Sequence, residues 1–158
     1  MEHDSVRKLW QEYLVANGEQ DEVTNKKYTS WHFCDNKKDA DELVELVLQG
    51  VKRATASLYV CYEYEQEELP KAGNYSIITD WDGIARCMIE TTGVQLVPFN
   101  QVTPEFAATE GEGDKSLEYW RRVHWDCFTR DMAEMGREPS EDMLVVCEEF
   151  QVVHRSDR

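Results

Sequence analysis

A lysine and a threonine stand three residues apart in a short connector, GVKRATASL, at residues 50–58. Lys52 offers a positive charge to a carbonyl oxygen, a phosphate or a developing oxyanion. Thr55 offers a hydroxyl that can donate or accept a hydrogen bond, and that becomes a nucleophile if a base lies within reach. The connector also follows an apolar helical pattern, and a cation is favourable at the carbonyl end of a helix without any further role. The pair therefore predicts either a shared pocket or an ordinary helix end.

A glycine-rich acidic stretch, EGEGDKS, occupies residues 110–116. Its glycines allow the backbone to approach a ligand closely. Glu110 and Glu112 could act as a general base or accept a hydrogen bond from the amine of a nucleobase. Acidic residues before a helix N-terminus are also ordinary stabilisers of that helix. Three carboxylates within five residues raise a third hypothesis, a divalent metal site, although their spacing does not match a calcium-binding loop.

The formal net charge of −15 over 158 residues limits the partners of the protein. Proteins that bind a duplex gain much of their affinity by neutralising phosphates with Lys and Arg. An acidic surface would mostly repel such a long polyanion. We therefore expect no duplex DNA partner, and we expect any contact with nucleic acid or nucleotide to be a local basic pocket.

Cysteine usage and hydropathy indicate the compartment. Five cysteines are scattered singly, with neither a disulfide framework nor a C-x-x-C metal pair, and their apolar neighbours favour reduced core thiols. No apolar run approaches the roughly 20 residues of a membrane span. The first residues, MEHDSVRKLW, lack the apolar core of a signal peptide. We expect a cytoplasmic protein without membrane contact.

Hydrophobic spacing and turn residues predict the elements that position these groups. Gly50 is a natural end for the helix before the connector, and the turn at 80–83 is a hairpin signal. For the segment after the connector, strand is a rival to helix. The expected helices cover 5–17, 39 or 41 to 50, 56–68, a turn from 103, and 116 to about 135, and the expected strands cover 28–34, 74–80, 83–99 and 143–154. This order predicts an α+β fold with a mixed or antiparallel sheet that could curl into a small barrel.

The connector and much of the surrounding sequence resemble the ASCH family, in particular its bacterial branch. The family signature G-x-K-x-x-T matches GVKRAT. The similarity extends over SWHFCDNKKDADELVELVLQGVKRATASL, over GNYSIITDWDGIARCMIETTGVQLVPFNQVTPEFAATEGEGDKSLEYWRRVHWDCFTRD and over PSEDMLVVCEEFQVV. The resemblance implies a PUA-like β-barrel flanked by helices. It also implies a single domain over 1–158, with its core at about 28–153 and the N-terminal helix packed on it.

The resemblance implies a function and a site as well. ASCH proteins are associated with RNA binding. Some resemble small amidohydrolases that remove an acyl group from modified cytidine with a Lys, a Thr and a Glu, and others resemble metal-assisted ribonucleases of single strands. Lys52 and Thr55 match the first two of those catalytic positions, and Glu112 or Glu110 falls in the loop that carries the third. The family often has an arginine two residues after the threonine, whereas this chain has Ser57. The resemblance therefore does not imply that a phosphate or carboxylate is bound at that position.

Five further residues are candidate ligand contacts, each with an ordinary structural explanation beside it. Trp31 could stack on a base, or it could be a core tryptophan. Arg121 could reach a phosphate, or it could be solvated or salt-bridged. The other three candidates are Arg53, Ser116 and Asp80. Their ordinary explanations are, in that order, a cation at a helix end, an N-cap and a residue preferred in turns.

Two other features are expected to be structural or to line the pocket. His124 falls on the apolar stripe of the predicted long helix, which favours a core histidine over a catalyst. Tyr62 and Tyr64 follow the connector and could line a pocket beside it.

The leading hypothesis is a pocket that binds a nucleobase, a nucleoside or a short single-stranded RNA. In its hydrolytic form Thr55 attacks an amide carbonyl, Glu112 or Glu110 takes the proton, and Lys52 either stabilises the oxyanion or lowers the pKa of the hydroxyl. This hypothesis needs no cofactor. The alternatives are a non-catalytic RNA-binding module and a single-strand ribonuclease that depends on Mn²⁺ or Mg²⁺.

Overall fold

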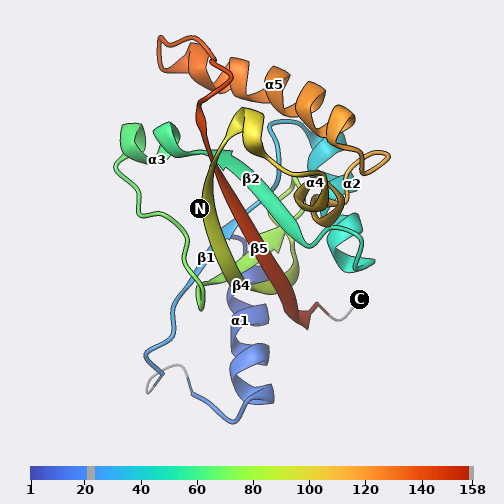
Figure 1. Ribbon diagram of the computed structural model, residues 1–158. Helices are drawn as coiled ribbons and strands as arrows, with labels where there is room; N and C mark the ends of the chain where they lie inside the picture. Colours follow the sequence, from blue (N-terminus) through green and yellow to red (C-terminus); the bar gives the residue numbers. More distant parts are fainter. Residues whose placement is uncertain (21–23, 157–158) are drawn as a thin grey trace.

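The structure is a computed structural model that describes residues 1–20 and 24–156 (Figure 1). Its helices are α1 (Asp4–Ala16), α2 (Lys37–Leu48), α3 (Tyr59–Glu65), α4 (Pro104–Glu110) and α5 (Leu117–Glu134), with one 3₁₀ turn at Phe99–Gln101. Its strands are β1 (Tyr28–Trp31), β2 (Ala54–Leu58), β3 (Tyr75–Thr79), β4 (Ala85–Pro98) and β5 (Leu144–Arg155). The predicted α+β class is confirmed.

The five strands form one mixed sheet in the order β1-β3-β4-β5-β2. β1 pairs with β3 in parallel, and the other three pairings are antiparallel. The hairpin between β3 and β4 is the predicted one, and the Ile84 N–H closes its turn on Asp80 Oδ1 at 3.0 Å. Among the described strands β1 and β2 are the two ends of this order, so the sheet is mixed as expected and its closure into a barrel stays a prediction.

Helices cover the sheet through three buried clusters. α1 packs on β3 and β4, α2 packs on a second region of the sheet, and α5 lies across the end of the molecule opposite α1, with α4 against β2 (Figure 1). The helical residues that make these contacts include Val6, Leu9, Trp10 and Leu14 from α1, Val44 and Val47 from α2, and Trp120, Phe128 and Met132 from α5.

The segment after the connector differs from the predicted helix over 56–68. Residues Ala54–Leu58 are strand β2, and α3 begins only at Tyr59. Pairing with β5, from Ala54 opposite Glu149 to Leu58 opposite Val145, gives this backbone its hydrogen bonds. The strand alternative was therefore correct for the first part of the segment, because a tertiary pairing overrides local propensity there.

Two global expectations can be compared with the structure. All five cysteines lie among the described residues and are free. Cys87 and Cys147 are buried and Cys61 and Cys127 half-buried, but Cys34 is exposed, so the expectation of a core thiol is wrong for Cys34. No helix within the described parts of the chain is long and apolar enough to cross a bilayer.

Candidate functional site

The connector after α2 is fastened at both ends by its backbone. Gly50 follows the helix with φ of +77°, a conformation that glycine adopts without steric cost. The N–H groups of Val51 and Lys52 then both donate to the Leu46 carbonyl, at 2.9 and 3.1 Å. The Arg53 N–H donates to the carbonyl of Thr109 in α4 at 2.9 Å. The end of α2 and the end of α4 are thus joined directly at the signature lysine.

The Lys52 ammonium is fully enclosed and fully hydrogen-bonded. The residue is 1 % exposed. Its Nζ donates to the Ala54 carbonyl at 2.7 Å, to Glu110 Oε2 at 2.9 Å and to Glu112 Oε2 at 2.7 Å. An ammonium has three N–H donors, so all three are used by the protein itself. The convergence of the connector and the acidic loop is therefore present in the structure.

Glu110 is the inner carboxylate of this cluster. Besides Lys52, it accepts a hydrogen bond at Oε1 from the indole Nε1 of Trp120 at 2.8 Å. His124 Nε2 lies 3.2 Å from the same oxygen. Glu110 is the last residue of α4, and Trp120 and His124 lie in the first two turns of α5. The two helices thus bring an acid, an indole and an imidazole together.

Glu112 is the outer carboxylate. Its side chain is 14 % exposed, against 1 % for Glu110, so it is the acid that a ligand can reach. The neighbouring glycines explain the loop sequence. Gly111 ends α4 with φ of +73°, and a Cβ there would lie 2.2 Å from the Val51 carbonyl oxygen. Close approach of the loop to the connector therefore requires glycine at this position.

The electrostatics of the three groups are unequal. Burial pushes the pKa of Lys52 down, but the charges of Glu110 and Glu112 more than offset this and raise it. Burial raises the pKa of Glu110, but Lys52 and then His124 outweigh it and hold that pKa well below the usual range. Burial, followed by the hydrogen bond and charge of Glu110, raises the pKa of Glu112 to about 7. Near neutral pH, Glu112 is therefore the member that exchanges a proton.

The cluster also contains residue types that bind metal ions. One ligand atom each of Glu110, Glu112 and His124 lies within 4.8 Å of the others. However, the Lys52 ammonium already bonds both carboxylates, so a divalent cation there would stand against a buried positive charge. We therefore assign no metal to this cluster.

Comparison with known proteins identifies the family. The ASCH domain profile matches residues 29–154. The chain belongs to the ASCH domain family. No curated protein sequence matches it significantly.

Two solved structures are similar to this ASCH protein over nearly the whole chain. One is an ASCH domain from Lactobacillus crispatus JV V101, with a TM-score of 0.88 and 37 % identity over 98 % of this chain and 97 % of the other. The second is a protein from Enterococcus faecalis V583, with a TM-score of 0.84 and 34 % identity over 96 % of this chain and 89 % of the other. The expected resemblance to bacterial ASCH proteins is confirmed.

The second signature residue, Thr55, lies on a different face. Successive side chains of a strand point to opposite faces, and Ala56 packs on the cluster that contains Trp120. The Thr55 side chain therefore projects from the opposite face of β2, where its cross-strand neighbour is Glu148. Glu148 is buried and accepts a hydrogen bond from Thr91 Oγ1 at 2.7 Å.

Thr55 does not bond to the cluster. Among the described residues, no hydrogen bond joins its hydroxyl to Lys52 or to either glutamate of the ASCH site. Its role as a nucleophile stays a prediction.

Among the predicted ligand contacts, Trp31 is linked to the cluster through Phe33. Its ring packs edge-on against Phe33 with centroids 5.0 Å apart, and the Lys52 ammonium lies 5.1 Å from the Phe33 ring centre. Arg53 is exposed, and its backbone bonds α4 and β5.

The other three predicted contacts have structural partners. Ser116 is the N-cap of α5 and accepts from the Tyr119 N–H at 3.0 Å. Asp80 holds the hairpin turn described above. Arg121 is exposed and donates to the Asn100 carbonyl at 3.5 Å. Whether any of them contacts a ligand stays a prediction.

Trp120 and His124 are the site residues that the sequence did not reveal. His124 is buried as expected, but it bonds the inner carboxylate rather than filling the core alone. Both residues follow the Ser116 cap at intervals of four, which places them one above the other on one side of α5. That spacing, directly after an acidic loop, is a signal that could have indicated their role.

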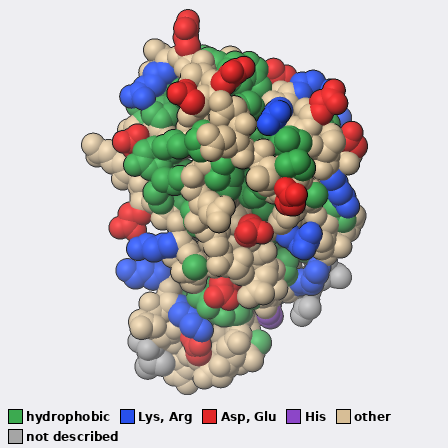
Figure 2. All heavy atoms as spheres, viewed as in Figure 1, with side chains coloured by type: hydrophobic (Ala, Val, Ile, Leu, Met, Phe, Trp, Pro, Cys, Tyr) green, Lys and Arg blue, Asp and Glu red, His purple; other side chains and the backbone are tan. Residues whose placement is uncertain are grey.

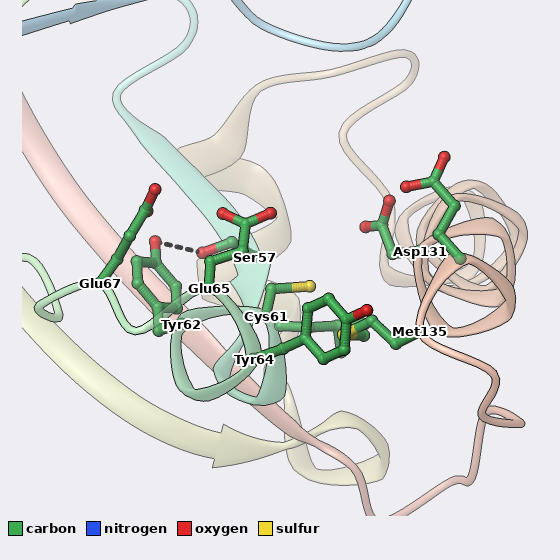
Figure 3. A pocket seen from close by; sticks show the side chains of 10 residues that line it. Ser57, Cys61, Tyr62, Tyr64, Glu65, Glu67, Asp131 and Met135 are labelled. Atoms are coloured by element: carbon green, nitrogen blue, oxygen red, sulfur yellow. Dashed lines mark hydrogen bonds between the residues drawn. The ribbon is translucent and has the colours of Figure 1, made fainter.

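Two hollows open elsewhere on the ASCH domain. One of about 430 Å³ lies between α3 and α5 and is walled by Tyr62, Tyr64 and several acids (Figure 3). Ser57 lines it too and shares a 2.9 Å hydrogen bond with the Tyr62 hydroxyl. The other, of about 310 Å³, is lined in part by Arg121. Neither hollow includes Lys52 or the two glutamates, so the predicted part of Tyr62 and Tyr64 in a Lys52 pocket has no support from these cavities.

Proposed function

We propose that this ASCH protein binds a nucleobase, a nucleoside or a short single-stranded RNA segment beside Glu112, and that it hydrolyses the amide of an acylated cytidine there. One observation carries the proposal. The signature lysine holds two carboxylates of different character, and the outer one both reaches the surface and titrates near neutrality. General acid–base catalysis needs such a group, because a pKa near the working pH allows it to take and return a proton.

The residues would divide the work as follows. Glu112 takes a proton from an attacking water, whose oxygen bonds to the acyl carbon, because Thr55, the nucleophile that the sequence predicts, lies on the opposite face of β2. It then returns that proton to the nitrogen that leaves as the amide C–N bond breaks. Because the three N–H groups of Lys52 are already bonded, we assign this residue the task of fixing Glu112 and its charge rather than direct contact with an oxyanion.

Tyr119 gives the base a surface on which to stack. A Cβ on Gly113 would lie 2.3 Å from the Tyr119 ring, so the ring lies directly against the loop beside Glu112. The Arg122 guanidinium lies 5.4 Å from the centre of the same ring. Stacking on a tyrosine is tolerant of base identity, and it is consistent with a nucleoside-sized ligand.

The surface favours a small ligand over a long one. On the face shown in Figure 2, Lys and Arg side chains are dispersed among acidic ones and do not gather in one patch. A chain of phosphates needs a continuous basic surface for strong binding. A neutral acylated nucleoside does not.

The test is a panel of acylated nucleosides and short single-stranded RNAs, offered with and without Mn²⁺ and with a chelator. The parent should release cytidine in the presence of chelator. Glu112→Gln should lower kcat by about 100-fold or more, since general acid–base groups contribute about that much. Glu118→Gln, an exposed acid on the first turn of α5, is the matched control and should behave as the parent.

Three results would contradict the proposal. Equal turnover by Glu112→Gln and the parent would remove Glu112 from the chemistry. Activity abolished by chelator would favour the ribonuclease alternative. Binding of RNA without conversion of any ligand, weakening steeply as salt rises, would favour the non-catalytic module.

A further inference from the structure

His124 presents both of its ring nitrogens to oxygen atoms. Its Nδ1 lies 2.9 Å from the Trp120 carbonyl, and its Nε2 lies 3.2 Å from Glu110 Oε1. The residue is 7 % exposed, and its ring stacks on the Trp120 indole with centroids 4.2 Å apart and planes 16° apart. The ring is therefore fixed in place, with an acceptor on each side.

The Trp120 carbonyl determines the proton on Nδ1. A carbonyl oxygen can only accept a hydrogen bond, so Nδ1 must carry a hydrogen. In a neutral imidazole the other nitrogen, Nε2, would then hold a lone pair. That lone pair would point at an oxygen of Glu110.

The surroundings of Glu110 exclude the remaining way to satisfy Nε2. A protonated Glu110 could donate to Nε2, but the donors around this carboxyl are aimed at an anion. Lys52 donates to Oε2, and the Trp120 indole donates to Oε1. Hydrogen bonds and an opposite charge of this kind favour the ionised form.

We propose that His124 is a buried imidazolium, and that this second cation keeps Glu110 ionised so that the exchangeable proton of the site resides on Glu112. The charge of His124 and Glu110 follows from the contacts alone, whereas the use of the Glu112 proton in catalysis rests on the proposed function. Lys52 and His124 then supply two positive charges against two carboxylates. The cluster is neutral when Glu112 is ionised, and it gains one positive charge when Glu112 takes a proton.

The titratable groups around His124 and Glu110 are consistent with the assignment. Glu110 ends α4, Glu112 lies in the following loop, and Lys52 lies in the connector. On β5, burial raises the pKa of Cys147 to about 12, so that thiol stays neutral. Burial lowers the pKa of His124, but the charge of Glu110 more than offsets it and the pKa lies above the ordinary value.

NMR of the full chain labelled with ¹⁵N-histidine tests the proposal directly. At about pH 7.5, well above the ordinary histidine pKa of about 6.5, the His124 ring should still show two protonated nitrogens. His32, whose Nδ1 lies 3.1 Å from the Phe33 carbonyl and whose ring lies 5.0 Å from that of Trp81, supplies the internal reference signal. A neutral His124 ring in the parent would overturn the proposal without any variant.

Two variants examine what holds the charge. Glu110→Gln should lower the pKa of His124 by about one unit or more, since a unit corresponds to the loss of about 1.4 kcal/mol of interaction. Glu118→Gln, on the same helix, should leave it unchanged. If Glu110→Gln does not fold, the titration of the parent still decides the charge of the ring.

Carboxyl ¹³C titration locates the exchangeable proton. In the parent, Glu112 should titrate near neutrality while Glu110 does not. In His124→Phe, both carboxyl signals should move together, because the two acids then share one proton. An unchanged carboxyl titration in His124→Phe would show a purely structural histidine. None of these measurements uses a ligand, so absence of hydrolysis would overturn the proposed function and leave this inference standing.

Discussion

At the scale of residues, the protonation of Glu110 and the protonation of Glu112 affect folding stability in opposite directions. The pKa of Glu110 is lowered in the fold, so its contribution to stability is present at neutral pH and is lost as pH falls through that low value. The pKa of Glu112 is raised to about 7 by burial and by Glu110. The folded state therefore binds more protons than the unfolded state between about pH 4.5 and pH 7, and stability falls as pH rises through that window.

Replacing Glu112 should remove this dependence. We expect the unfolding free energy of Glu112→Gln to exceed that of the parent at pH 8 by about 1 kcal/mol or more, because the amide has no charge to bury. The difference should shrink towards pH 5, where the parent acid is protonated. Urea unfolding at a series of pH values measures it. A gap that grows as pH falls would mean that the folded state lowers the pKa of Glu112.

Part of this site could be predicted from residue types in the sequence, and the rest depends on contacts between elements that are distant in the chain. The signature lysine and the acidic loop were found in the sequence because their types and glycines are unusual in a chain with few clustered cations. The division of tasks between Glu110 and Glu112 depends on which side chain α5 covers, and that is a tertiary fact. The separation of Thr55 from the glutamates likewise depends on the pairing of β2 with β5, which the pattern of residues 54–58 does not specify.

At the scale of elements, the close contact between the α4 cap and the connector aligns the cluster. A Cβ on Gly111 would lie 2.2 Å from the Val51 carbonyl oxygen and 3.1 Å from the Lys52 Cα. Such a side chain would push the backbone at Gly111 away from the backbone of the connector, and no change of rotamer can relieve this clash. The glycine-rich stretch can be recognised in the sequence, but the need for glycine at this residue follows only from the packing.

Gly111→Ala should therefore lower stability by about 2–4 kcal/mol, combining the strain of a positive φ with the clash. Gly136→Ala is the matched control. It has φ of +68° but no atom within 4 Å of the added Cβ, so it should lose only the strain component of about 1 kcal/mol. Thermal and urea unfolding measure both. Equal losses for the two variants would show that α4 and the connector separate easily.

At the scale of the whole molecule, the described residues form five α-helices and one sheet in a protein with a large excess of negative charge. There are 32 acidic side chains and 17 Lys and Arg side chains. The alternation of elements and their classes could be predicted from hydrophobic periodicity, which is a local property. The strand order could not, since β1 lies beside β3 and β2 beside β5 through pairings between segments far apart in the chain.

The charge excess should make the stability of the protein rise with salt. Repulsion among surplus carboxylates opposes the compact state, and at about 0.1 M salt it is screened beyond about 10 Å. Surface pairs such as Lys37 with Asp41 and Asp82 oppose this trend only weakly, because exposed ion pairs contribute little. The buried pair of Lys52 and Glu110 is screened least of all.

We therefore expect Tm to rise by several degrees between about 0.02 and about 0.3 M NaCl, as measured by differential scanning fluorimetry. Choline chloride at equal ionic strength should give the same rise, which separates screening from binding of Na⁺. A decrease in Tm would mean that exposed ion pairs contribute more to this fold than carboxylate repulsion costs. In that case the unpaired acids must lie far enough apart for water alone to weaken the repulsion between them.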